Sequence, residues 1–181
     1  MKINIFFMLL IFLSFNIFAH GSSKVVLKDG VNFIDLNGDG IKDVIFHAEF
    51  DNNTSHPSNT LTIFIKNKNG NYNIVPIPHD VGFTWFDFRL SASSIKITNY
   101  ELRKENGYYY MVIAQKIHNK LKNDSIFDEL PVKFSRYDIK TNHEIPGVSI
   151  FYWDYTNSYI TKNKYKSVDD AFIEFNLEGK L

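Results

Sequence analysis

Alternation between apolar and polar residues recurs along this 181-residue chain and restricts the folds that it can adopt. A period of two is the repeat of a β-strand with one buried face. This pattern, with aromatic and β-branched enrichment, predicts strands at residues 25–27, 31–34, 43–50, 61–65, 72–75, 95–102, 108–114, 132–137 and 148–155. Turn residues at 68–70 and 105–107 predict hairpins between neighbouring strands. The sequence therefore predicts an all-β fold, either an antiparallel β-sandwich or a barrel-like domain.

One short helix is expected at the C-terminal end. Ser167 precedes Asp170 by three residues, which is the spacing of a capping box. Val168, Ala171, Phe172 and Phe175 then form an apolar stripe at helical spacing. We expect a helix of about two turns that packs on the sheet.

The N-terminal residues resemble an export signal. Lys2 is followed by a largely apolar run at residues 5–18, and Ala19 supplies the small residue that a signal peptidase prefers. The run is short for a membrane span, so we expect cleavage after residue 19 and export to the periplasm. An uncleaved N-terminal anchor is the alternative. Residues 20–181 are then expected to form a single β-rich domain.

Composition excludes several partners and chemistries. Removal of Lys2 with the signal leaves 19 basic and 20 acidic residues, a net charge of −1, so neither nucleic acid nor an anionic membrane is an expected partner. The absence of cysteine excludes disulfides and thiol nucleophiles. The domain must therefore be held by its core, with the help of a metal if one binds.

The segment at residues 35–43 has the spacing of a calcium loop. Oxygen ligands would come from Asp35, Asn37, Asp39, the Ile41 carbonyl and Asp43. Gly38 and Gly40 allow the tight turn that such a loop needs. Position 12 of the loop is Phe46 in place of the EF-hand glutamate, and the flanks are predicted strands, so the loop resembles those of FG-GAP blades. We expect one structural Ca²⁺; the alternative is a metal-free turn.

No set of residues matches a known catalytic pattern. Ser93 and Lys96 match the SxxK spacing of penicillin-recognising enzymes, but the strand alternation around Ile95 turns Ile95 and Lys96 to opposite faces. The six histidines lack zinc-site spacing, and no GxSxG elbow is present. We predict no catalytic residue and expect that the protein is not an enzyme.

Aromatic residues cluster at 83–88, 108–110 and 151–155. Consecutive residues of a strand face opposite sides, so each cluster must contribute to both faces. Trp85 and Trp153 therefore belong either to a partly exposed recognition surface or to a core with two buried sides.

The chain also resembles a known family. Residues 31–46 and 50–57, which contain the loop and its Asp-Asn-Asn-Thr-Ser-His-Pro continuation, together with residues 161–165 and 167–172, resemble the CarG-type carbapenem intrinsic resistance proteins. Those are small periplasmic bacterial proteins that accompany carbapenem biosynthesis and also occur in bacteria that make no antibiotic. The resemblance implies non-hydrolytic protection against a carbapenem, through binding of the antibiotic or of a periplasmic protein.

A second functional class stays open on the sequence alone. Periplasmic lysozyme inhibitors include small exported β proteins with aspartate-rich calcium loops, and they insert a loop into the enzyme's active site. The polar segments at residues 51–59 and 116–128 are the candidates for such a loop.

Overall fold

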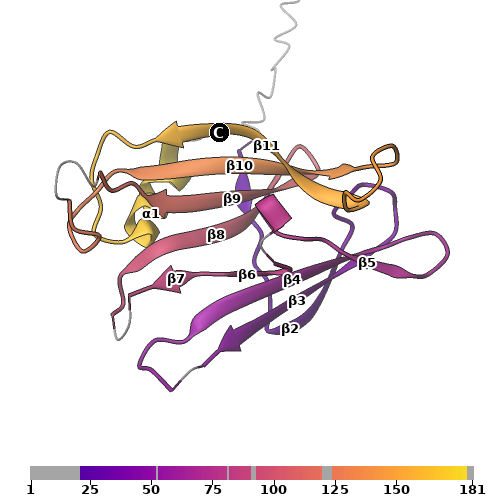
Figure 1. The fold of residues 1–181 in the computed structure, drawn as a ribbon, viewed down its shortest axis with the longest axis horizontal. Helices are drawn as coiled ribbons and strands as arrows, with labels where there is room; N and C mark the ends of the chain where they lie inside the picture. The colour runs from indigo at the N-terminus through magenta and orange to yellow at the C-terminus, as the bar shows by residue number, and fades with distance from the viewer. Residues whose placement is uncertain (1–20, 52, 81, 91–92, 120–123, 179–181) are drawn as a thin grey trace, which may run out of the picture.

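Two antiparallel β-sheets pack against each other, and a helix covers the opposite face of the larger sheet (Figure 1). The computed structural model describes residues 21–51, 53–80, 82–90, 93–119 and 124–178, so the predicted signal peptide at residues 1–19 lies outside it. Of the two predicted architectures, the all-β sandwich is the one observed.

The sheets differ in size and in their place along the chain. Sheet A contains, in order across it, β1 (Ser23–Lys24), β8 (Lys96–Glu105), β9 (Tyr108–Lys116), β10 (Val132–Thr141) and β11 (Phe151–Ile160), with β7 (Phe88–Arg89) also paired to β8. Sheet B contains β2 (Gly30–Ile34), β3 (Asp43–Phe50), β4 (Ser58–Lys66) and β5 (Tyr72–Ile74), with β6 (Thr84–Phe86) also paired to β4. The remaining elements are a 3-10 turn, η1 (Pro78–Asp80), and the helix α1 (Val168–Glu178).

The alternation locates most of these strands, with one error at the start of the chain. The predicted strand at residues 25–27 is wrong, because β1 ends at Lys24 and Val26 is 88 % exposed. The Val25 amide still donates to the Leu102 carbonyl at 2.8 Å, after which the chain leaves the edge of sheet A. The segment at 83–88 is divided between the sheets, since β6 belongs to sheet B and β7 to sheet A.

Sheet A is buried on both faces, which explains the nearly continuous apolar run in β9. Met111 packs in the core between the sheets, whereas Tyr110 and Val112 pack on the α1 side. The Arg136 guanidinium lies 3.8 Å from the centre of the Tyr110 ring and covers its face. Two buried faces need apolar residues at successive positions, so β9 has no simple alternation.

The two tryptophans belong to the core. Trp85 of β6 and Trp153 of β11 meet edge to face, with ring centres 5.8 Å apart and planes at 85°. They are 5 % and 6 % exposed. Of the two alternatives for these residues, the two-sided core is therefore correct, and this pair joins the two sheets.

The helix begins as predicted and is longer than expected. The Ser167 amide donates to Asp170 at 3.3 Å, and the Asp169 amide donates to the Ser167 hydroxyl at 3.4 Å, which is a capping box. The helix spans 11 residues, about three turns, and its apolar stripe packs on sheet A. No helix in the described ranges is both long and apolar enough to span a bilayer.

Candidate functional site

The loop predicted to bind calcium is a tight turn whose side chains bond its own backbone. Asp35 accepts hydrogen bonds from the amides of Gly38 at 2.8 Å, Asp39 at 3.1 Å and Gly40 at 2.9 Å. Asp39 in turn accepts the Ile41 amide at 2.8 Å. Gly38 and Gly40 have φ values of 74° and 84°, which favour glycine. The predicted residues therefore lie in one tight turn that is closed by hydrogen bonds to its own backbone.

Asp43 lies at the inner end of this loop and is fully buried. One carboxylate oxygen accepts the Leu36 amide at 2.8 Å, and the other accepts the Lys66 amide at 2.9 Å. Burial raises the pKa of Asp43, the two amides oppose that effect, and the charges of Asp39 and Asp35 add to it. Asp43 therefore ties the loop to the end of β4, a role that the calcium spacing does not predict.

The five predicted ligands thus lie within one turn, although they do not form a closed shell of carboxylates. Within the described ranges, no three His, Cys, Asp or Glu side chains are grouped closely enough to hold a metal ion. A complete site would need the Asn37 amide oxygen and the Ile41 carbonyl as well. Calcium binding by this loop therefore stays a prediction.

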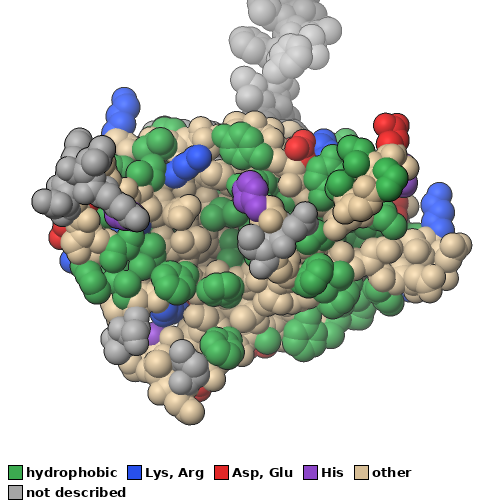
Figure 2. All heavy atoms as spheres, in the orientation of Figure 1, with side chains coloured by type: hydrophobic (Ala, Val, Ile, Leu, Met, Phe, Trp, Pro, Cys, Tyr) green, Lys and Arg blue, Asp and Glu red, His purple; other side chains and the backbone are tan. Residues whose placement is uncertain are grey.

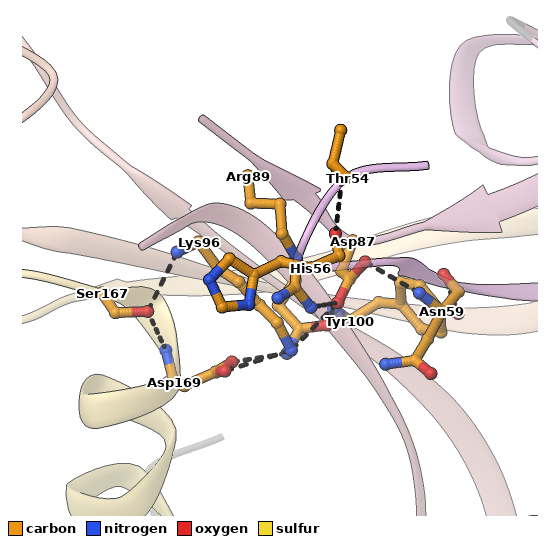
Figure 3. Close-up of polar contacts among 10 residues, drawn as sticks. Thr54, His56, Asn59, Asp87, Arg89, Lys96, Tyr100, Ser167 and Asp169 are labelled. Atoms are coloured by element: carbon orange, nitrogen blue, oxygen red, sulfur yellow. Dashed lines mark hydrogen bonds and ion pairs between the residues drawn. The ribbon is translucent and has the colours of Figure 1, made fainter. Parts of the chain in front are cut away.

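A buried polar cluster marks the point where the chain crosses from sheet B to sheet A (Figure 3). Asp87 lies between β6 and β7 with no exposed side-chain surface, and it accepts bonds from Lys96 Nζ and Arg89 Nη2, each at 2.9 Å. The Asn59 amide donates to the other Asp87 oxygen at 2.9 Å. The same Lys96 ammonium lies 3.1 Å from Asp169 of α1. One carboxylate therefore connects both sheets, and through Lys96 it also connects the helix.

The protonation states in this cluster follow from its surroundings. Burial alone would raise the pKa of Asp87, but the hydrogen bonds and charges of Lys96 and Arg89 outweigh it and lower that pKa. Burial and the Asp87 charge raise the pKa of Tyr100, so its hydroxyl stays protonated and donates to the Asn59 carbonyl at 3.2 Å. The cluster thereby fixes Tyr100 and the course of β6 and β7.

A pocket of about 350 Å³ lies next to this crossing, between the two sheets. Its apolar walls include Ile77, Trp85, Phe88, Tyr100, Ile113 and Tyr137. Its polar walls include Thr98, Gln115, Lys133 and Ser135. Figure 2 shows hydrophobic side chains gathered on this face over the positions of β6 and β7. The volume is within the range of small-molecule sites, roughly 300–1,000 Å³.

The pocket exists because the inner face of sheet A changes from apolar to polar along its strands. Tyr137 packs in the core between the sheets. Four residues earlier on β10, Lys133 is on the same face, and it lies opposite Gln115 of β9, which lies opposite Thr98 of β8. These three polar side chains form one row across the sheet and line the pocket. A polar row does not attract the opposite sheet, so this end of the sandwich stays open.

Two residues that line the pocket carry a polar group with no partner among the described residues. The Trp85 indole Nε1 is buried and has no hydrogen-bond partner in the described part of the chain. Lys133 takes part in none of the ion pairs formed there. A lysine without an ion-pair partner in the described part of the chain favours a ligand that carries a negative charge.

Apart from Trp85, which was a candidate for a recognition surface, the lining residues were not predicted as a site, although one signal was present in the sequence. Lys133 and Ser135 lie on the same face of β10 as Tyr137 and Ile139, whose side chains pack in the core. Polar residues on an otherwise apolar strand face mark either a binding site or the end of the buried part of the strand. The sequence of β10 does not distinguish these two cases, because the answer depends on which residues of the opposite sheet face them.

The SxxK spacing at Ser93 and Lys96 has no catalytic geometry. Lys96 opens β8, and its ammonium is shared between the carboxylates of Asp87 and Asp169. The Ser93 hydroxyl accepts the Ile95 amide at 3.1 Å. The prediction that this segment is a strand, and not the helix that SxxK enzymes require, is confirmed.

Comparisons with known proteins agree with this fold. A crystal structure of CarG matches with a TM-score of 0.77 and 40 % sequence identity, and the match covers 84 % of this chain and 94 % of that one. A search of curated proteins found no match. The family model described as "Carbapenem resistance protein CarG-like" matches residues 27–174. This chain therefore belongs to the CarG-like family of carbapenem-resistance-associated proteins.

Proposed function

We propose that this protein is exported to the periplasm and protects the cell by binding a carbapenem, without hydrolysing it, in the pocket beside Trp85 and Lys133. The pocket between the sheets is the observation that carries this proposal. The proposal of export rests on residues 1–19, which resemble a signal peptide. Mass spectrometry of protein recovered from the periplasm tests it, because cleavage of the signal should give the mass of a chain that starts at residue 20.

The chemistry of the pocket suits a small bicyclic carboxylic acid. A carbapenem has a compact apolar ring system, a lactam carbonyl and a carboxylate. The aromatic walls would cover the rings, and Lys133 would pair with the carboxylate. The family membership points to the same ligand class.

A binding role, as opposed to turnover, is supported by how the chain uses its reactive side chains. The one lysine in a serine-enzyme spacing, Lys96, is held by two carboxylates and serves the fold. The pocket itself places Ser135 beside Ile113 and Lys133, with no histidine or carboxylate within its lining that is paired to this serine. These residues can orient a ligand, and Ser135 makes no hydrogen bond to Lys133 or to another base among the described residues that would mark it as an activated nucleophile.

Lys133→Met is expected to weaken carbapenem binding by roughly 10- to 150-fold, the effect of losing one charge-assisted hydrogen bond. Methionine replaces the unbranched apolar stem of the lysine side chain and removes its charge. The measurement is calorimetric or tryptophan-fluorescence titration with the drug. Lys140→Met is the matched control, because Lys140 is on the same strand, is exposed and does not line the pocket.

The same samples separate binding from hydrolysis. We expect purified protein to leave the drug intact, and cells that express Lys133→Met to become more susceptible than cells with Lys140→Met. Drug turnover would overturn the non-hydrolytic proposal. Equal titration curves for the two variants would show that the pocket is not the binding site.

We also propose that the loop at 35–43 binds one structural Ca²⁺. Chelation is expected to lower the melting temperature, because Asp35, Asp39 and Asp43 are then left without a neutralising cation. Asp39→Ala should melt at the same temperature with calcium and with chelator. Asp154→Ala, at an exposed position in β11, should keep the calcium response. Coincident wild-type curves would show that the loop is only a turn.

A further inference from the structure

A second, smaller pocket shares a wall with the pocket of about 350 Å³ beside Lys133, which is called the main pocket below. This side pocket has a volume of about 120 Å³. Residues 77–79, at the start of η1, line both pockets. The other walls of the side pocket are Pro76, Val148, Ser149, Tyr152 and Trp153. The two pockets therefore adjoin along one short segment of the chain.

The tryptophan pair of the core also stands between the two pockets. Trp85 lines the main pocket, and Trp153 lines the side pocket. Their rings meet edge to face with centres 5.8 Å apart, and both side chains are buried. Close-packed core rings form a rigid wall. A ligand in the main pocket would therefore lie next to the side pocket.

The shared segment is held in place at both ends. Before it, the Val75 amide donates to the Ile63 carbonyl at 3.0 Å. The Ile77 amide donates to the Gly82 carbonyl at 2.9 Å and closes the turn, while the Ile77 side chain packs on the core. His79 has a φ of 69°, a left-handed conformation that histidine adopts more readily than most residues. This turn therefore fixes the spacing between the two pockets.

The side pocket differs from the main pocket in its chemistry. None of the described residues that line it is Lys, Arg, Asp or Glu, and most are apolar or aromatic. A charged group placed there would lose its water without gaining a partner. An apolar cavity of roughly 150 Å³ holds a benzene molecule, so a space of similar size can hold one small ring. The side pocket thus suits an uncharged apolar or aromatic group.

One wall of the side pocket is a loop that the Asn142 side chain stiffens. Asn142 Nδ2 donates to the Ile145 carbonyl at 2.9 Å and to the Val148 carbonyl at 3.2 Å. Asn142 Oδ1 accepts the amides of Glu144 at 3.2 Å and Ile145 at 3.0 Å. Val148 and the adjacent Ser149 are thereby held at the pocket before a ligand arrives, which lowers the entropy cost of binding.

We propose that the side pocket is a second compartment of the ligand site and binds an apolar or aromatic substituent of the acid in the main pocket. This inference rests on the proposed function, because the main pocket must hold the carbapenem nucleus. The carboxylate of the nucleus faces Lys133, and the substituent passes His79, an exposed residue that lines both pockets. A carbapenem with an uncharged apolar arm therefore binds more tightly than the bare nucleus.

Two carbapenems test the proposal by calorimetric titration: the nucleus with no arm on the carbon next to the carboxylate-bearing one, and the same nucleus with a phenyl-bearing arm there. We expect the wild-type protein to bind the second roughly tenfold more tightly, the gain from burying about 55 Å² of apolar surface.

Ser149→Trp fills the side pocket, so it should reduce the ratio of the two affinities to about one and change the affinity for the bare nucleus by less than about twofold. Glu144→Trp is the matched control and should keep the tenfold ratio, because Glu144 is in the same loop, is exposed and does not line the side pocket.

Melting curves show whether each variant is folded, and Asn142→Leu provides a second disruption, because it frees the loop wall. It should also remove the advantage of the arm; the ratio is the readout, since a loss of stability alone would weaken both drugs alike. Equal affinities in the wild type, or a tenfold ratio that survives both Ser149→Trp and Asn142→Leu, would overturn this inference and leave the proposed function in place. Failure of both drugs to bind would overturn the proposed function, and the inference with it.

Discussion

Asp87→Asn is expected to lower the free energy of unfolding by about 3–5 kcal/mol, the usual cost of removing one partner from a buried ion pair. Asparagine keeps the shape of the side chain but leaves Lys96 and Arg89, both of which contact this carboxylate at 2.9 Å, without their shared anion. For a chain of this length the melting temperature should fall by roughly 10 °C. Urea unfolding followed by circular dichroism measures the loss.

The matched control for this variant is Asp169→Asn. Asp169 also pairs with the Lys96 ammonium, at 3.1 Å, but its side chain is 44 % exposed. Water screens an exposed pair, so the expected cost is about 1 kcal/mol or less. Equal losses in the two variants would show that burial adds nothing to the Asp87 interaction.

The pH dependence of stability tests the same residue in the wild-type protein. Because the folded-state pKa of Asp87 is lowered from 3.8, its contribution is present above the unfolded-state pKa and is lost as pH falls through the folded-state value. The difference in unfolding free energy between wild type and Asp87→Asn should therefore shrink below about pH 4. A difference that stays constant down to pH 2 would contradict the lowered pKa.

Phe134→Ala is expected to destabilise the protein by about 3–5 kcal/mol, the usual range for truncating a buried phenylalanine. Phe134 is fully buried under α1 and stacks on Phe175, with ring centres 4.4 Å apart, while Phe172 meets its edge at 5.1 Å. The variant leaves a cavity under the helix, which three turns of helix cannot close without shifting. Urea unfolding measures the total loss.

The position of the cavity adds a second readout to this prediction. Limited proteolysis should cut α1 in Phe134→Ala well before it cuts the wild-type helix, because the docking contacts are lost locally. Phe127→Ala provides the control, since Phe127 is 53 % exposed and should change stability by no more than about 0.5 kcal/mol. If the helix stays as resistant in Phe134→Ala as in wild type, the stacked rings do not hold it.

The strands and the helix could be predicted because local physical rules act on short segments. Alternation located strands such as β3 and β4, and the Ser167 capping box located the start of α1. The error at residues 25–27 has the same origin, because local hydrophobicity there is high while pairing depends on β8, about 80 residues away. The distant partner, and not the segment, determined where β1 ends.

The candidate pocket was harder to predict, because its residues come from distant parts of the chain. Thr98, Gln115 and Lys133 are unremarkable in the sequence, and they meet Trp85 of the 83–88 aromatic cluster only once β6, β8, β9 and β10 are in register. The calcium loop shows the opposite case, since its residues are neighbours and their spacing alone suggests a ligand. Even there, the contact of Asp43 with the Lys66 amide depends on the fold.

The sequence by itself determined the all-β class, the capped helix, the calcium-like loop and the resemblance to the CarG-like family, because each depends on residues close together in the chain. Tertiary structure alone decided that Trp85 and Trp153 are core residues, that Asp87 joins both sheets, and that Lys133 is left without an ion-pair partner among the described residues. The burial of a side chain and the pairing of its charge depend on the residues around it. In this protein those residues are brought together by pairing between strands that are far apart in the sequence.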